Sequence, residues 1–83
     1  MIWVLEAKAL GDYTLYVRFS DGNVGTVNLK NFVFADARPV VMALRDPNVF
    51  AALRVASDTV VWSNGFDLAP EFLHSRLVRG AAA

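Results

Sequence analysis

The feature that most constrains the fold is a strict alternation of side chains that ends at an Asp-Gly pair. From position 13 to 19 every second side chain is apolar or aromatic, so one face of an extended strand can pack on a core. Asp21-Gly22 tolerates the positive φ angles of a tight turn, and residues 24–29 return as a second strand. Residues 2–9 are apolar and rich in β-formers, which predicts a preceding strand covered on both faces. The first third of the chain therefore predicts a three-stranded antiparallel meander.

The second half of the chain predicts a helix and then another hairpin. The Asp46 carboxylate can cap free backbone N–H groups, and Pro47 fits the first position of a helix because its missing donor is not needed there. This pair predicts a helix of about two turns. Residues 53–56 and 59–62 then predict two strands, with their turn at Ser57-Asp58.

A last helix is predicted near the end of the chain. Asp67 is expected to cap it, Pro70 lies in its first turn, and Gly80 ends it. With these elements the sequence predicts an α+β fold: an antiparallel sheet of about five strands with two short helices covering one face. We expect a single α+β domain over residues 1–79 and a frayed tail over residues 80–83.

Residues 30–44 form the segment whose structure the sequence leaves open. Residues 31–34 fit either a helical turn or an irregular apolar loop, and residues 40–44 fit either a short strand or the approach to a helix. The segment is too apolar for an ordinary loop. Its large side chains therefore either pack in the core or offer a patch to a partner. The side chains concerned are Phe32, Phe34, Val41 and Met42.

Composition narrows the class of protein. Hydrophobic residues make up 55% of the 83 and charged residues 19%, which argues against intrinsic disorder and leaves apolar surface for a partner. Eight basic and eight acidic residues cancel, so no net field attracts nucleic acid or a membrane. The chain has no cysteine, which excludes disulfides and thiolate metal sites. Since no apolar run approaches ~20 residues and the start lacks the basic end of a secretory signal, we expect a cytoplasmic protein.

The residues that could carry catalysis each have a simpler structural interpretation. His74 is expected to be a surface or boundary histidine, because its neighbour Ser75 points about 100° away on a helix and cannot face it. Asp21, Asp58 and Asp67 all lie at expected turns or caps, where a carboxylate has a local role. The sequence therefore predicts no catalytic residue and no metal site, and we expect a protein without enzymatic activity.

The sequence offers two candidate sites for a ligand. The turn at residues 64–67 precedes a helix start, which can accept an anion, although Asp67 would occupy those donors and repel one. Tyr16 and Arg18 share a strand face and could stack on a base, but the other basic residues are scattered along the chain. Residues 21–25 have two glycines without a phosphate-binding pattern. We therefore expect no cofactor, and nucleic-acid binding by this domain is disfavoured.

Two motifs in the second half of the chain are familiar. Residues 62–73 read Trp-Ser-Asn-Gly-Phe-Asp-Leu-Ala-Pro-Glu-Phe-Leu and resemble the W-x-N-G-x-D-x-A-P-E-x-L stretch of domain-of-unknown-function family 2442, a set of small bacterial proteins. Residues 44–50 resemble the L-R-D-P-x-x-F helix start of that family, and residues 15–22 resemble its strand and turn. The resemblance covers residues 2–77. Residues 32–41 depart from it, being less glycine-rich than the family pattern, and Ser63 stands where the family often has proline.

The resemblance implies a compact α+β fold but no catalytic residue. Some relatives carry a helix-turn-helix segment after this domain, and we expect this chain to lack it because the sequence stops at Ala83. Many relatives are encoded beside another small protein, in an arrangement that resembles toxin–antitoxin pairs.

Together these observations predict a non-enzymatic protein-interaction module, either a homodimer or the partner of a neighbouring small protein. Its predicted contact residues are Phe32, Phe34, Val41 and Met42, followed by Tyr16 and Arg18. The alternative is an accessory domain for a small ligand or nucleic acid, which would use the turn at residues 64–67 or the face that carries Tyr16 and Arg18.

Overall fold

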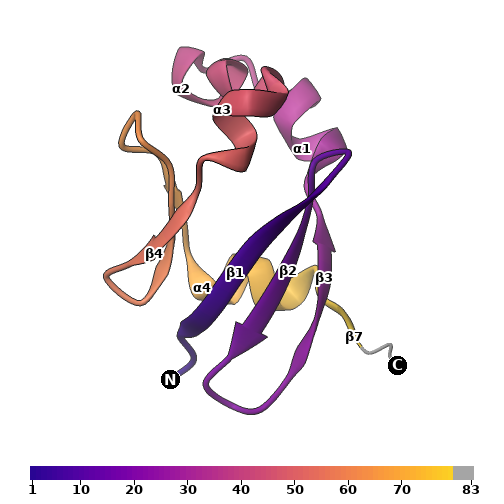
Figure 1. Cartoon of the computed structure of the whole chain (residues 1–83), viewed down its shortest axis with the longest axis vertical. Helices are drawn as coiled ribbons and strands as arrows, with labels where there is room; N and C mark the ends of the chain where they lie inside the picture. Colours follow the sequence, from indigo (N-terminus) through magenta and orange to yellow (C-terminus); the bar gives the residue numbers. More distant parts are fainter. Residues whose placement is uncertain (80–83) are drawn as a thin grey trace.

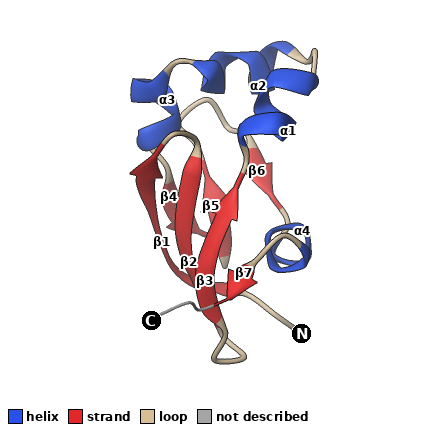
Figure 2. Cartoon of the chain, turned by 90° about the vertical axis from the view of Figure 1, so that its right-hand side faces the viewer, coloured by secondary structure: helices blue, strands red, loops and turns tan. Residues whose placement is uncertain are grey.

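The computed structural model describes residues 1–79, so the expected tail at residues 80–83 lies outside the described residues. Within residues 1–79 the fold is α+β, as the sequence predicts, and its strands divide between two antiparallel sheets. A four-stranded sheet has the order β1-β2-β3-β7, and a three-stranded sheet has the order β4-β5-β6. Figure 2 shows the two sheets as separate layers, with α1, α2 and α3 gathered at one end of the molecule and α4 at its side.

The predicted meander forms the larger part of the four-stranded sheet. Its strands are β1 (Val4–Gly11), β2 (Thr14–Phe19) and β3 (Val24–Asn28), and the short β7 (Val78–Arg79) pairs with β3. The last helix was expected to run to Gly80, but the chain leaves it earlier and returns to the sheet. The reason lies partly in Gly25, where an added Cβ would stand 2.1 Å from the Val78 carbonyl oxygen, so only glycine lets β7 approach.

The three-stranded sheet contains the second predicted hairpin. Its strands are β4 (Arg54–Ala56), β5 (Thr59–Val61) and β6 (Asp67–Leu68). Ser57 and Asp58 both have positive φ angles, which is the geometry of the two-residue turn that matches the twist of paired strands. The hairpin at Ser57-Asp58 is therefore confirmed.

The undecided middle segment is helical. The helices of the described chain are α1 (Lys30–Ala35), α2 (Pro39–Met42), the 3-10 turn η1 (Ala43–Arg45), α3 (Pro47–Ala51) and α4 (Pro70–Ser75). α3 begins as predicted, with the Asp46 carboxylate accepting the Asn48 backbone N–H at 2.9 Å. None of the helices described in residues 1–79 is long and apolar enough to cross a membrane.

The core lies between the two sheets and beneath the helices. Trp62, Phe19 and Leu15 are its largest fully buried side chains, and Leu44 and Leu73 join it from the helical segments. The inward residues of β2 alternate with exposed or half-buried ones, as the sequence pattern predicts.

Strand β1 differs from the expectation of a strand covered on both faces. Its register with β2 shifts between Val4 and Glu6 and again between Ala9 and Gly11, so Leu5 and Leu10 are extra residues in two β-bulges. Both leucines are exposed, at 45% and 56% of their surface. β1 is therefore buried on its core face alone.

Candidate functional site

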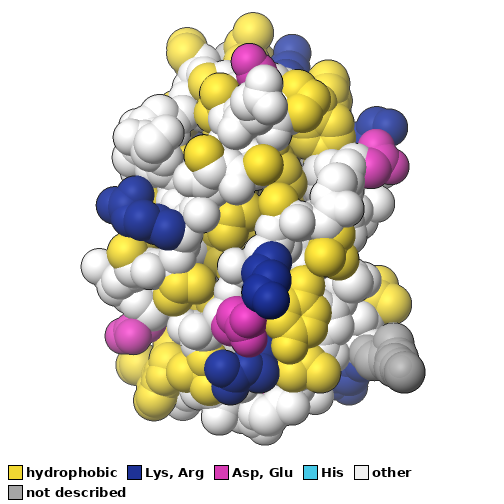
Figure 3. Space-filling model, in the orientation of Figure 1, with side chains coloured by type: hydrophobic (Ala, Val, Ile, Leu, Met, Phe, Trp, Pro, Cys, Tyr) yellow, Lys and Arg dark blue, Asp and Glu magenta, His cyan; other side chains and the backbone are white. Residues whose placement is uncertain are grey.

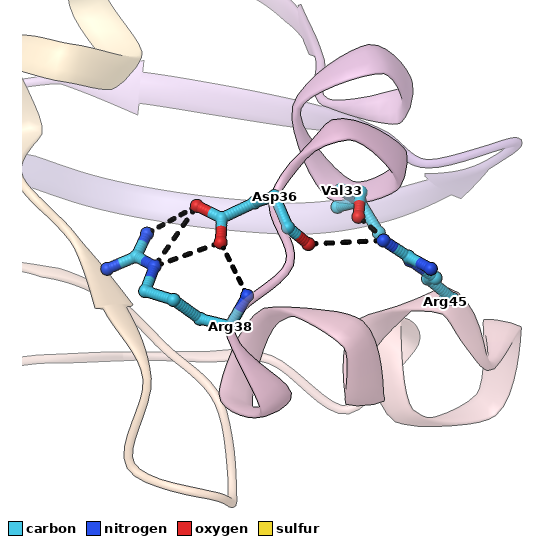
Figure 4. A network of polar contacts seen from close by, with 4 residues as sticks. All are labelled: Val33, Asp36, Arg38 and Arg45. Carbon is cyan, nitrogen blue, oxygen red and sulfur yellow. Dashed lines mark hydrogen bonds and ion pairs between the residues drawn. The ribbon is translucent and has the colours of Figure 1, made fainter.

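Arg45 holds the carbonyl end of α1 (Figure 4). Its Nε donates to the Val33 carbonyl at 3.1 Å, and one of its terminal nitrogens donates to the carbonyls of Phe34 and Asp36 at 3.4 and 3.1 Å. The last carbonyls of a helix have no partner within the helix, and a cation there also complements the helix dipole. The arginine of the family-like Leu-Arg-Asp-Pro motif therefore has a structural role.

Asp36 and Arg38 form a second polar contact in the same region (Figure 4). The Asp36 carboxylate accepts the Arg38 backbone N–H at 2.9 Å and pairs with the Arg38 guanidinium at 2.7 Å. Hydrogen bonds from the Arg38 side chain, and then from its backbone, lower the pKa of the Asp36 carboxyl to about 2. The pair closes the turn between α1 and α2 and leaves Asp36 ionised at neutral pH.

The turn at residues 64–67 is the predicted small-ligand site, and the polar groups of its Asn64 side chain are engaged within the chain. The Asn64 amide nitrogen donates to the Val40 carbonyl at 2.9 Å, and its oxygen accepts the Phe66 backbone N–H at 3.1 Å. Asp67 lies in β6 and is exposed, so its expected role as the helix cap is wrong; the residue before α4 is Ala69. The helix starts two residues later because Pro70 sets its first position.

The buried tryptophan of the same motif joins the three-stranded sheet to α3. The Trp62 indole N–H donates to the Phe50 carbonyl at 2.8 Å, and the two rings lie 5.8 Å apart. Trp62 exposes only 1% of its surface. Trp62 and Asn64 of this motif thus both bind backbone groups of the helical segment.

His74 contacts the β2–β3 turn and not a nucleophile. Its Nε2 lies 2.9 Å from an Asp21 carboxylate oxygen, and its ring packs edge-on against Phe19. The Ser75 hydroxyl donates to the Phe72 carbonyl at 2.7 Å. The Asn23 backbone N–H lowers the pKa of Asp21, with smaller contributions from the Asn23 and His74 side chains. Among residues 1–79 no group of three or more His, Asp or Glu side chains could hold a metal ion.

The first four predicted contact residues are divided between core and surface. Val41 is completely buried. Phe32 is half-buried between the Phe66 and Phe72 rings, at 6.3 and 5.3 Å between centroids. Phe34 and Met42 are exposed, at 48% and 43% of their surface. Val41 therefore packs in the core, and Phe34 and Met42 lie at the surface, where contact with a partner stays a prediction.

Tyr16 and Arg18, the remaining predicted contact residues, lie on the face of the four-stranded sheet that is turned away from the core. We call this surface the outer face. Cross-strand register pairs Tyr16 with Lys8 and Thr26, and Arg18 with Glu6 and Val24. Thr26 is in turn paired with Val78 of β7. Side chains of directly paired residues share one face, so the four strands contribute to one continuous surface.

The outer face gathers exposed apolar side chains that the sequence reasoning missed. They are Trp3, Leu5, Leu10, Val24 and Val78, and each exposes 38–64% of its surface. Strand alternation turns Trp3 outward just before β1, and the two bulges turn Leu5 and Leu10 of β1 outward. Figure 3 shows hydrophobic side chains around a small group of charged ones on this side of the molecule. The sequence pattern indicates this apolar surface only weakly, because the bulges interrupt the alternation of side chains and β7 was expected to be helix.

The charged group at the centre of the outer face consists of one acid and two bases. The Glu6 carboxylate lies 3.5 Å from the Lys8 ammonium and 3.3 Å from the Arg18 guanidinium. Both cations therefore have an anionic partner within the chain.

A hollow of about 320 Å³ lies where the β1–β2 turn meets α3. It is lined mainly by apolar and aromatic groups: Ala9, Gly11, Asp12, Tyr13, Pro47, Phe50 and Ala51. The Asp12 carboxylate on its rim is paired with Lys30 at 3.2 Å. The hollow therefore offers shape and apolar contact but little polar recognition.

Comparison with known proteins gives a family and a fold. The family model described as protein of unknown function, DUF2442, matches residues 4–77. No curated protein matches the chain. A crystal structure of a protein from Nitrosomonas europaea ATCC 19718, described as a putative DNA-binding protein, superposes with a TM-score of 0.78 at 20% identity. The match covers 93% of this chain and 49% of that one, so this chain spans about half the length of that structure.

Proposed function

The chain belongs to the DUF2442 family of proteins of unknown function, and from this premise we propose that it is a non-enzymatic protein-interaction module whose partner docks on the outer face. The observation that carries the proposal is the concentration of exposed apolar side chains on that one sheet face. Soluble monomers rarely leave large contiguous apolar patches exposed, and such patches often mark protein-binding surfaces.

The chemistry of the outer face supports a protein partner. Tyr16 lies in the second of four strands, half-buried, with Arg18 beside it along the strand. Tyrosine and arginine are enriched among the residues that dominate protein–protein binding energy, especially near the centre of an interface. The exposed valines and leucines around them supply a rim that excludes water.

The residues of the two motifs support the same proposal indirectly. Arg45, Asn64 and Trp62 each bind a backbone carbonyl of another element, so their polar groups are engaged within the chain. Residues engaged in this way are poor candidates for catalysis. Recognition is then expected on a surface that the fold leaves open, and the outer face is such a surface.

More specifically, the proposed module is cytoplasmic and either forms a homodimer or binds a neighbouring small protein, as one half of a toxin–antitoxin pair does. Phe34 and Met42 would extend the contact at the helical end of the molecule, because each exposes nearly half of its surface there. Val41 is not included, since its side chain is completely buried.

The experiment is affinity purification of the tagged chain from its host, comparing the native protein with Tyr16→Ala/Arg18→Ala. The native protein is expected to elute in a stoichiometric protein complex that resists nuclease, and the double variant is expected to lose it. Arg54→Ala/Val55→Ala is the matched control, because it truncates an exposed basic and an exposed apolar side chain on β4, in the other sheet. A complex that survives the double variant would contradict the outer-face proposal.

The second candidate is nucleic-acid binding by the same face. The description of the Nitrosomonas europaea structure as a putative DNA-binding protein favours it, as does the presence of Lys8, Tyr16 and Arg18 on one sheet surface. The pairing of both cations with Glu6 counts against it. Binding that falls steeply between low and moderate salt and disappears with nuclease would favour this candidate over the first.

A further inference from the structure

We infer that the occupant of the outer face is a second copy of this chain, bound face to face about a two-fold axis. The inference rests on the proposed function, which makes the outer face a protein-binding surface. It goes further by naming the partner and the contacts that would join the two copies.

The outer face carries charges of both signs, so each copy can offer an acid and a base to the other. Glu6 lies between Lys8 and Arg18, at 3.5 and 3.3 Å, and all three side chains retain exposed surface. A two-fold axis brings the same patch of both copies together, so a residue i that meets residue j is matched by j meeting i. The carboxylate of each copy can therefore approach a cation of the other, and each ion pair is made twice.

The shape of the outer face suits a copy of itself. Two sheets that stack by their faces lie about 10 Å apart, with side chains from both faces filling the space between them. The outer face supplies such side chains from successive strands: Leu5 and Leu10 from β1, Tyr16 from β2, Val24 from β3 and Val78 from β7. Two copies would thus form a sheet sandwich across the dimer axis.

The size of the molecule limits the area that such a dimer can bury. The outer face belongs to the broad side of the molecule (Figures 1 and 3), whose long dimensions are 33 and 25 Å between Cα atoms. An ellipse of those axes, which spans the whole of that side of the molecule, covers about 650 Å² before side-chain relief is added, against ~800 Å² per partner in a standard interface. A dimer of standard size therefore needs the full outer face, including the bulged leucines and β7, and some of the surface around it.

The first test is the mass of the purified chain by sedimentation over a concentration series. The native chain is expected at twice its 9.1 kDa. Tyr16→Ala is expected to weaken the dimer by at least about 30-fold, as for a central anchor residue, with an unchanged circular dichroism spectrum. Val55→Ala, on β4 of the other sheet, is the control and is expected to leave the dimer intact. A dimer that resists Tyr16→Ala or breaks with Val55→Ala would overturn the inference.

The second test uses the reciprocity of a two-fold interface. Glu6→Arg places like charges opposite each other in its own dimer, and so does Arg18→Glu, so each variant alone is expected to be monomeric. When the two are mixed, every contact between positions 6 and 18 of different copies joins opposite charges. An equimolar mixture is therefore expected to recover the dimer, and a mixture that stays monomeric would overturn the inference.

The outcomes separate the two proposals. A native chain that is monomeric when pure, yet forms a stoichiometric complex with another protein that Tyr16→Ala abolishes, would overturn the second copy as occupant and leave the proposed function standing. A chain that is monomeric and forms no such complex would overturn both.

Discussion

In the β1–β3 meander each strand is joined to the next by a ladder of backbone hydrogen bonds, and β2 is paired on both sides from Thr14 to Arg18. The helical end, residues 30–51, is joined instead by side chains that bind backbone carbonyls at a distance in sequence. Arg45 reaches α1, Asn64 reaches α2, and Trp62 reaches α3. Figure 1 shows this helical end lying above the sheets. Repetitive backbone pairing thus joins the elements of one region, and a few long-range hydrogen bonds from side chains join those of the other, on the same buried core.

The largest expected effect is the loss of stability when one buried leucine in each region is truncated. Leu15 of the meander and Leu44 of the helical end are both buried, at 0% and 1% exposure. If both regions share one cooperative core, Leu15→Ala and Leu44→Ala should each lower the free energy of unfolding by about 2–5 kcal/mol. Chemical denaturation measures both. A Leu44→Ala cost below about 1 kcal/mol would mean that the helical end contributes little to global stability and opens separately.

An intermediate effect is expected from Arg45→Met, which keeps the length of the side chain and removes its three hydrogen bonds. The free energy of unfolding should fall by about 1–2 kcal/mol, because carbonyls at the end of α1 lose a charged donor. Hydrogen exchange should quicken in α1 before it changes in β2. Arg54→Met is the matched control on the exposed strand β4. Uniform acceleration in both regions would show that they are not separable in this way.

The smallest expected effect is a loss of stability at low pH. Asp36 has a folded-state pKa of about 2 against an ordinary value of 3.8, so its pairing with Arg38 stabilises the fold above about pH 4. That contribution is lost as the pH falls from 3.8 through about 2, because the unfolded chain then binds the proton more readily. Amide signals of the helical end, followed by NMR between pH 5 and pH 2, should move before those of β2. Asp36→Asn should remove this part of the pH dependence, and an unchanged titration would contradict the assignment.

The predictions from sequence succeeded where the determinants are local. Asp21-Gly22 and Ser57-Asp58 fix their turns through their own backbone preferences, and Asp46 caps α3 through an N–H two residues away. The α+β class follows from these elements. The helical character of residues 30–44 could not be decided, because the Arg45 contacts that hold α1 span up to 12 residues and leave no periodic trace.

The candidate site was predictable only in part, for a related reason. Tyr16 and Arg18 follow from the alternation along β2, and their exposure on an outward face was foreseeable. Leu5 and Leu10 were not, because each lies in a bulge that places it outside the alternation. Val78 was not either, since its position depends on a glycine 53 residues earlier that leaves room for β7.

The two bulges in β1 also bear on how the protein avoids aggregation. A long, regular strand at the border of a sheet is a template on which other chains can polymerise, and bulges break the even row of donors and acceptors that such growth requires. β7, at the opposite border, has two residues within the described part of the chain. Both margins of the sheet are therefore poor seeds for fibrils. The exposed leucines remain available for a specific contact while the backbone around them discourages amyloid-like stacking.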